Sequence, residues 1–181
     1  MKIAILRLGS VDSEVVERVK SGLSKVFPTT ECVILDEVML VPRDAYNVIR
    51  RQYHSTSLLM KIREYMKKSG SDRVLGITNV DLYVPRLNFV FGAAEYLGGA
   101  AIISLCRLRP EFYGRPVNRE LFIERSVKEA VHELGHTLGL DHCRDSSCVM
   151  FFSNSILDTD RKNVGFCEKC SSLVMARSGR T

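Results

Sequence analysis

The chain has 181 residues, a formal net charge of +5 and a hydrophobic fraction of 45%. These values are ordinary for one soluble globular domain that can bury a hydrophobic core without needing cross-links to stabilise it. The basic residues are spread along the sequence in short clusters such as Arg50-Arg51 and Lys67-Lys68. This distribution is typical of solvated surfaces and argues against a nucleic-acid-binding protein.

Membrane insertion and secretion are also disfavoured. The apolar run 3–6, which follows Lys2, meets Arg7 too soon for the core of a signal peptide, and no small-residue cleavage site follows. The apolar stretch 87–106 is interrupted by Glu95, so we interpret it as two strands joined by a turn rather than as a membrane span. We therefore expect a cytoplasmic protein, in which six cysteines are thiols or metal ligands more readily than disulfides.

The N-terminal third of the chain begins with a strand and a helix. The β-branched, apolar run at residues 2–8 predicts a buried strand. Apolar residues at helical spacing then predict a helix that is capped by Asp12 or Ser13 and closed by Pro28. Residues 32–35 form a second apolar run and predict a second strand.

The next segments continue the alternation of helix and strand. We expect a helical region over residues 44–68, interrupted near His54 and ended by Gly70, and a third strand over 73–78. A strand–helix–strand–helix–strand order favours an α/β fold with a largely parallel sheet. This sheet would be packed on helices and twisted in the usual right-handed sense.

Two strands and a long helix are predicted before the most informative part of the sequence. Residues 89–96 and 100–105 resemble strands joined at Gly98-Gly99, and at least one of them could run antiparallel because no helix precedes it. Residues 110–116 are expected to form a loop. Residues 118–138 then carry apolar side chains at helical spacing and predict a long helix.

The end of that helix carries the pattern H-E-x-x-H-x-x-G-x-x-H at residues 132–142. His132 and His136 are four residues apart, so they share one helix face and can bind the same ion. Gly139 can end the helix in a left-handed turn, which lets His142 supply a third nitrogen. Three protein ligands leave the fourth position of a tetrahedral zinc open to water, as in catalytic sites.

Glu133 lies one residue from the line of these ligands and is placed to contact a metal-bound water. Zinc lowers the pKa of such a water to about 7, and a carboxylate can accept its proton as general base. The pattern therefore predicts hydrolysis of an amide by activated water. One alternative is a helix whose histidines pack in the structure without binding a metal. The motif also leaves open that the substrate is an amide other than a peptide.

Four cysteines near the C-terminus form two short-spaced pairs. Cys143 and Cys148 are followed by Cys167 and Cys170, a spacing that fits a structural four-thiolate zinc site. Two local disulfides, or a redox-active pair at 167 and 170, are the alternatives. Because Cys143 directly follows His142, we hypothesise that the thiolate zinc fixes the backbone that presents this histidine.

The remaining cysteines and histidine have simpler interpretations. Cys32 lies within an apolar strand and Cys106 at the end of another, so each is expected to be a small buried side chain. His54 lies in a polar stretch, which favours a surface position over a ligand role.

The motif at residues 132–142 matches the pattern of metzincin zinc peptidases, and Met150 is the candidate for their downstream Met-turn. With C-x₄-C-x-M and C-x-x-C added, the whole run resembles the archaemetzincins. The resemblance covers residues 129–170, about a quarter of the chain, and its motif is highly specific. In metzincins this methionine forms an apolar floor beneath the zinc and does not bind it.

The resemblance implies a metzincin-like α/β (α+β) fold and two zinc ions per chain. Its residues would be a catalytic base at Glu133, a catalytic zinc on His132, His136 and His142, and a structural zinc on Cys143, Cys148, Cys167 and Cys170. It also implies an antiparallel edge strand lining the cleft, which we place at residues 89–96. The chain would form a single domain, 1–181, with an upper α/β part over 1–139 and a small zinc-bound C-terminal part over 140–181.

The leading hypothesis is therefore a monomeric zinc metallopeptidase with a narrow range of peptide or protein substrates. A second hypothesis is a zinc-ribbon-like module that binds nucleic acid through Lys169, Arg177 and Arg180 without turnover. Acidic residues nearby in the sequence lower the net positive charge of this segment, and no row of aromatic residues accompanies it. We therefore expect a protein that has no nucleic-acid or membrane partner.

Overall fold

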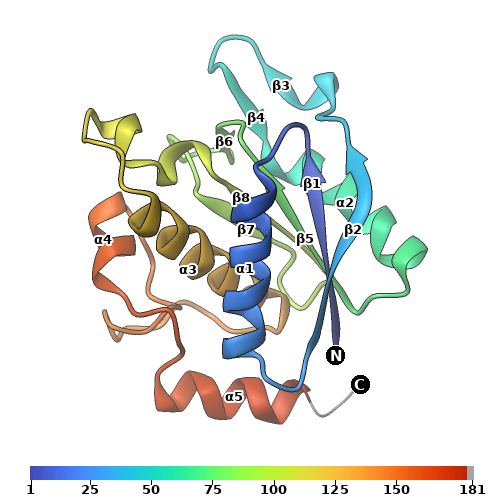
Figure 1. Cartoon of the computed structure of the whole chain (residues 1–181), viewed down its shortest axis with the longest axis vertical. Coiled ribbons are helices and arrows are strands. Elements are labelled where there is room, and N and C mark those ends of the chain that lie inside the picture. Colours follow the sequence, from blue (N-terminus) through green and yellow to red (C-terminus); the bar gives the residue numbers. More distant parts are fainter. Residues whose placement is uncertain (179–181) are drawn as a thin grey trace.

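The computed structural model describes residues 1–178. Its centre is a twisted five-stranded sheet in the order β2-β1-β5-β8-β7 (Figure 1). Four strands run parallel, and β7 pairs antiparallel with β8 at one edge. The bounds are Lys2–Leu8 for β1, Glu31–Met39 for β2, Arg73–Thr78 for β5, Gly92–Ala94 for β7 and Ala100–Ser104 for β8. The predicted mostly parallel sheet with an antiparallel edge strand is confirmed.

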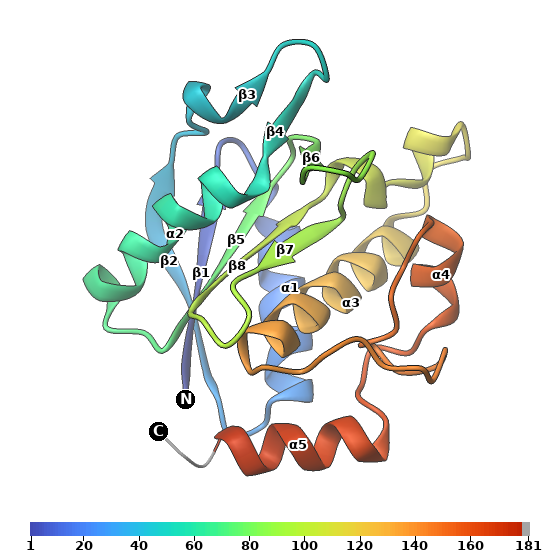
Figure 2. The ribbon, with the colours of Figure 1, turned by 180° about the vertical axis from the view of Figure 1, so that it is seen from behind.

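Helices cover both faces of the sheet (Figure 2). Helices α1 (Ser13–Val26) and α3 (Arg119–Thr137) pack on one face, and α2 (Ser55–Ser69) packs on the other. Because side chains alternate along a strand, Ile3 and Ile5 of β1 join the core under α1 and α3, while Ala4 and Leu6 join the core under α2. The N-cap of α1 is Asp12, whose carboxylate accepts a hydrogen bond from the Glu14 amide.

The prediction of a helical region from residue 44 is wrong for its first half. Residues 43–54 form a 3₁₀ turn, η1 (Arg43–Ala45), and a hairpin of β3 (Tyr46–Asn47) and β4 (Gln52–His54). Asn47 accepts a hydrogen bond from the Arg50 amide at 3.0 Å, a local turn that competes with helix formation. The hairpin joins β6 (Leu82–Tyr83) in a small second sheet.

Two further segments differ in detail from the predicted elements. The edge strand β7 is shorter than expected because Val90 instead forms a bridge with Leu82 of the small sheet. The expected loop at 110–116 contains a 3₁₀ helix, η3 (Pro110–Tyr113), which follows another, η2 (Cys106–Leu108). The long helix α3 begins after Asn118 as predicted, and the Asn118 side chain caps it by accepting from the Leu121 amide.

The segment beyond Gly139 contacts α3 both near its middle and at its C-terminal end. It contains two helices that sequence periodicity did not predict, α4 (Ile156–Arg161) and α5 (Glu168–Ser178). The fully buried Arg125 of α3 binds both carboxylate oxygens of Asp160, at 2.6 and 2.7 Å, which fixes α4 to α3. Arg177 of α5 donates to the Leu138 carbonyl at the end of α3. None of the helices described within residues 1–178 has the length and hydropathy that a membrane-spanning helix requires.

Candidate functional site

A cleft of about 390 Å³ lies between the edge strand β7 and helix α3. Its upper wall is formed by residues of the segment 84–94, which ends in β7. Its floor is formed by one face of α3, and its lower wall by the chain that follows the predicted Met-turn. The cleft residues from α3 and from the chain that follows it are Glu129, His132, Glu133, His136, His142, Phe152, Ser153, Asn154 and Lys162.

The three predicted histidines meet at this cleft. His132 and His136 project from successive turns of α3, and their Nε2 atoms lie 3.1 Å apart. The chain then turns back at Gly139, which has a φ of 82°, and brings His142 to the same point. One ring nitrogen from each of the three histidines lies within 4.8 Å of the others.

Backbone carbonyls determine which nitrogen of each helical histidine carries hydrogen. Nδ1 of His132 lies 2.8 Å from the Val149 oxygen, and Nδ1 of His136 lies 2.8 Å from the Leu140 oxygen. A carbonyl only accepts, so each Nδ1 donates and both Nε2 lone pairs face one another. Two acceptors at 3.1 Å repel each other unless a cation lies between them. The donor set and its outer hydrogen bonds therefore fit a zinc ion.

Burial keeps these imidazoles in the form that binds metal. It lowers the pKa of His132 well below its usual value, and the pKa of His136 and His142 is lowered for the same reason. The rings are therefore neutral at neutral pH, so a metal ion need not displace a proton.

Glu133 lies in the cleft beside His132 and is 5% exposed. Burial, followed by the nearby Glu129 carboxylate, raises its pKa well above the usual range, and the charge of Lys162 opposes this rise. A carboxylate whose pKa is raised binds a proton more strongly than an exposed glutamate does. The site thus combines a candidate base with three candidate metal ligands.

Gly92 of β7 makes room for Glu133. A Cβ atom at position 92 would lie 2.6 Å from both Cγ and Oε1 of Glu133, and 2.8 Å from the Ile102 carbonyl oxygen. The backbone oxygen cannot move cheaply, so either β7 or the glutamate must shift. The missing side chain therefore lets the edge strand approach the candidate base closely.

We expect Gly92→Ala to lower kcat for peptide hydrolysis by about one to two orders of magnitude, because small displacements of catalytic groups have effects of this size. Gly165→Ala is the matched control, since a Cβ at position 165 meets no atom within 4 Å. Steady-state kinetics of both variants would check this. Equal kcat values would show that Glu133 tolerates the displacement.

Met150 packs against α3 at Gly135. It is fully buried, and a Cβ atom on Gly135, which lies between His132 and His136 in α3, would overlap its sulfur. The neighbouring backbone also contributes, because the Met150 oxygen accepts from the Cys143 amide at 2.9 Å. Met150 therefore lies against the part of α3 that carries the first two histidines, and Gly135 provides the space.

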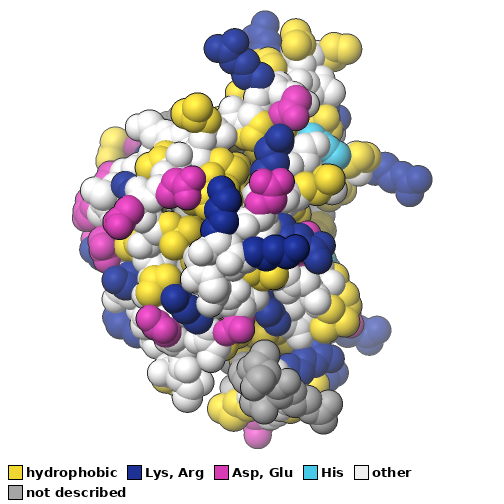
Figure 3. All heavy atoms as spheres, turned by 90° about the vertical axis from the view of Figure 1, so that its right-hand side faces the viewer, with side chains coloured by type: hydrophobic (Ala, Val, Ile, Leu, Met, Phe, Trp, Pro, Cys, Tyr) yellow, Lys and Arg dark blue, Asp and Glu magenta, His cyan; other side chains and the backbone are white. Residues whose placement is uncertain are grey.

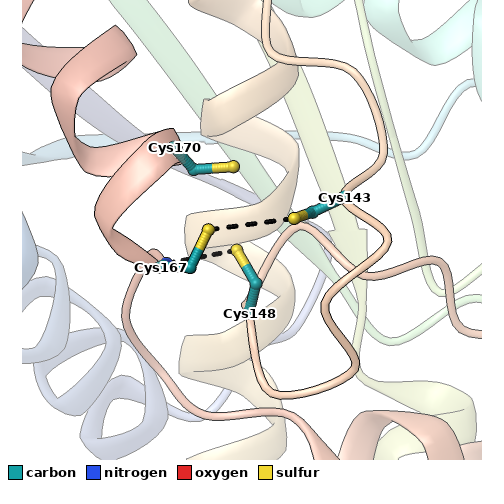
Figure 4. Close-up of side chains that lie close together, drawn as sticks. All are labelled: Cys143, Cys148, Cys167 and Cys170. Carbon is teal, nitrogen blue, oxygen red and sulfur yellow. Dashed lines mark hydrogen bonds between the residues drawn. The ribbon is translucent and has the colours of Figure 1, made fainter.

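The four predicted cysteines converge on one point (Figure 4). Their sulfurs lie within 4.8 Å of one another, with Cys143 and Cys167 sulfurs 3.8 Å apart. All six cysteines of the chain are free, so the structure does not form the two local disulfides considered as an alternative. The Cys167 amide donates to the Cys148 sulfur at 3.3 Å, a contact that suits a thiolate. Four sulfurs in this arrangement fit a closed tetrahedral zinc site.

The other candidate residues lie elsewhere. Cys32 is 9% exposed and belongs to the core as predicted, whereas Cys106 is half-buried. His54 is half-buried, and its Nδ1 lies 3.0 Å from the Ser57 hydroxyl, outside both clusters. Lys169 and Arg177 lie on α5, and Arg180 falls outside the described residues.

The hairpin that sequence reasoning missed supports the upper wall of the cleft. Arg50 donates to the carbonyl oxygens of Leu87 and Asn88, at 2.7 and 2.9 Å. Arg107 of η2 lies 4.3 Å above the Phe89 ring and binds Asp81 through two hydrogen bonds of 2.7 Å. These contacts join residues distant in sequence, and the local pattern carries no signal for them.

The family of the chain follows from its comparison with known proteins. The profile described as Peptidase family M54 matches residues 1–176. The chain belongs to peptidase family M54. Among its M54 relatives, the archaemetzincin of Methanocaldococcus jannaschii is 46% identical over 170 residues, which cover 94% of this chain and 90% of the relative. The archaemetzincin of Archaeoglobus fulgidus is 42% identical over 179 residues, covering 96% and 99%.

Solved structures agree with this assignment to M54. The archaemetzincin of Methanopyrus kandleri superposes with a TM-score of 0.86 at 38% identity, covering 99% of this chain and 96% of the other. A zinc-dependent peptidase from Methanocorpusculum labreanum gives a TM-score of 0.85 at 31% identity, covering 95% and 99%. The predicted archaemetzincin resemblance is confirmed. This M54 chain is a zinc-dependent metallopeptidase, and nothing in these matches favours a nucleic-acid-binding module.

Proposed function

We propose that His132, His136 and His142 hold the catalytic zinc and that Glu133 is the general base for peptide hydrolysis. The observation that carries this proposal is the approach of the His132 and His136 Nε2 atoms to 3.1 Å while both Nδ1 atoms donate to carbonyls. When bound, zinc lowers the pKa of water and polarises the carbonyl under attack.

Glu133 performs the proton transfers in this proposal. Its carboxylate accepts a proton from the attacking water and later delivers it to the nitrogen of the departing amine. The low exposure of Glu133 excludes bulk water from this exchange. A side chain at position 92 would collide with Glu133, so Gly92 leaves free the space that the glutamate occupies in the cleft.

An extended peptide fits the upper wall. β7 is the last strand in the sheet order, and Gly92, Ala93 and Ala94 line the cleft. A free strand edge offers backbone donors and acceptors, so a substrate can pair along it as an added strand. The contacts made by Arg50 and Arg107 hold this wall in place. Because a fixed wall adapts little to different side chains, this supports a narrow rather than a broad substrate range.

The cysteine cluster is proposed to hold a second, structural zinc, giving two ions per chain. Four protein sulfurs fill a tetrahedral shell and leave no position for water, so this ion would not catalyse. We divide the single domain into an upper α/β part, 1–139, and a C-terminal part, 140–181. The cysteines and the Met-turn support this division because both lie after Gly139.

We further propose a cytoplasmic monomer without nucleic-acid partners. The free state of all six cysteines supports a reducing compartment. On the face shown in Figure 3, Lys and Arg side chains alternate with Asp and Glu instead of forming one basic patch. On α5, Arg177 is already engaged with the Leu138 carbonyl.

The direct test of the proposed activity is hydrolysis of a diverse peptide mixture by zinc-loaded protein, with products identified by mass spectrometry. Cleavage is expected with zinc, and it should be lost after chelation and return when zinc is added back. An intact mixture after incubation with protein of verified zinc content would contradict the proposal.

A further inference from the structure

Two buried polar groups of the cleft have no hydrogen-bond partner within the described part of the chain. They are the ammonium of Lys162 and the hydroxyl of Ser153, and both residues line the cleft. The Lys162 side chain is 0% exposed. Buried polar groups in native proteins are nearly always satisfied, so two such donors in a substrate cleft suggest a ligand group.

The Lys162 ammonium lies beside a single carboxylate. Its Nζ is 3.0 Å from Oε1 of Glu129, close enough for an ion pair but without the geometry of a hydrogen bond. The same oxygen lies 3.4 Å from the Thr159 hydroxyl. An ammonium has three N–H donors, so this one retains at least two after Glu129 is counted.

The fold holds this lysine in place beside the site. Lys162 directly follows α4, and the two hydrogen bonds between Arg125 and Asp160 fix α4 to α3. Glu129 precedes His132 by three residues on α3, or about 4.5 Å along the helix axis. One residue of an extended peptide spans about 3.3 Å. A side chain one or two residues from the scissile bond can therefore reach Lys162.

We propose that Lys162 and Ser153 form a subsite for an acidic side chain, Asp or Glu, within two residues of the bond that is cleaved. Both unpartnered groups can donate, and a carboxylate is the side-chain group that only accepts. A flexible four-carbon stem lets the ammonium turn from Glu129 toward such a ligand. The proposal rests on the proposed peptidase function and names its substrate class.

The charges around the subsite make Lys162 decisive. Glu129 lines the cleft and carries the sign that repels an acidic substrate, while Lys162 beside it carries the opposite sign. Without the lysine charge, an acidic side chain would face the Glu129 carboxylate alone, and this carboxylate is also present in Glu133→Gln protein. Loss of Lys162 should therefore reverse the preference for acidic peptides, not merely weaken it.

The test measures binding rather than turnover. Fluorescent alanine-based decapeptides with one Glu, Gln or Leu at each successive position are titrated by anisotropy into zinc-loaded Glu133→Gln protein. At one position the Glu peptide should bind about tenfold or more tightly than the Leu and Gln peptides, the size expected for a buried charged hydrogen bond. Adding Lys162→Met should make the Glu peptide the weakest binder at that position.

Controls separate this subsite from general effects. Lys128→Met removes a different buried lysine, which lies on α3 and is paired with Glu124 at 2.7 Å. This variant should keep the preference for the Glu peptide. If Lys162→Met does not fold, the double change Lys162→Met with Glu129→Gln removes the pair without leaving a buried charge. Equal binding of Glu, Gln and Leu peptides at every position, or a Glu preference that survives loss of Lys162, would overturn the proposal.

Failure of the subsite and failure of the peptidase function remain distinguishable. Binding to the Glu133→Gln protein does not require hydrolysis, and hydrolysis by wild-type protein is measured separately. Cleavage without a Glu preference would overturn the subsite alone. A Glu preference without cleavage would overturn the peptidase function alone.

Discussion

Replacement of Glu133 by glutamine is expected to lower kcat for peptide hydrolysis by about two to four orders of magnitude, the usual contribution of a general base. Glutamine keeps the shape of glutamate but cannot accept a proton. The three histidines are unchanged, so zinc content should stay at the wild-type level. KM should change little, because the cleft walls are formed by other residues. Steady-state kinetics together with elemental analysis would measure both quantities.

Glu120→Gln is a suitable control for this experiment. Glu120 lies in the first turn of the same helix, and its side chain is 75% exposed. This variant should retain wild-type kcat. Glu133→Gln activity within a few-fold of wild type, at equal zinc content, would show that another group accepts the proton.

Replacement of Cys170 by serine is expected to weaken zinc binding at the histidines by about tenfold or more, although Cys170 does not contact them. The four-sulfur cluster includes Cys143, which adjoins His142. The Cys143 amide also bonds to the Met150 oxygen, and the preceding carbonyl, of Val149, orients His132. Loss of one thiolate should loosen this segment, and outer contacts of this kind typically change metal affinity 10- to 100-fold.

Competition with a chromophoric chelator would measure that affinity in the folded variant. Cys106→Ser is the matched control, because Cys106 is free and lies outside both clusters. A folded Cys170→Ser protein with wild-type affinity at the histidines would show that the two sites are independent.

The site was largely predictable because its residues are close together in sequence. Helix periodicity places His132 and His136 on one face, and the glycine at 139 returns the chain toward them. The cysteine pairs follow the same principle, since each pair has a spacing that suits one ion. In such cases the chemistry of the site is encoded locally.

The parts that sequence reasoning missed depend on contacts between distant segments. Lys162 reaches Glu129 across 33 positions of the chain, and Gly92 matters only because β7 lies against Glu133. The hairpin at 46–54 carries apolar residues that resemble a helix pattern, yet a turn at Asn47 and pairing with β6 determine its structure. Local propensity is a weak prior where tertiary contacts decide the conformation.

Two metal sites of different kinds are the central feature proposed for this enzyme. Elemental analysis of protein purified with zinc should give two zinc ions per chain in the wild type and one in His136→Ala. The remaining ion should be the one held by the four cysteines, as an anomalous-scattering map would show. A single ion in the wild type, or an unchanged count in His136→Ala, would contradict a catalytic zinc on His132, His136 and His142.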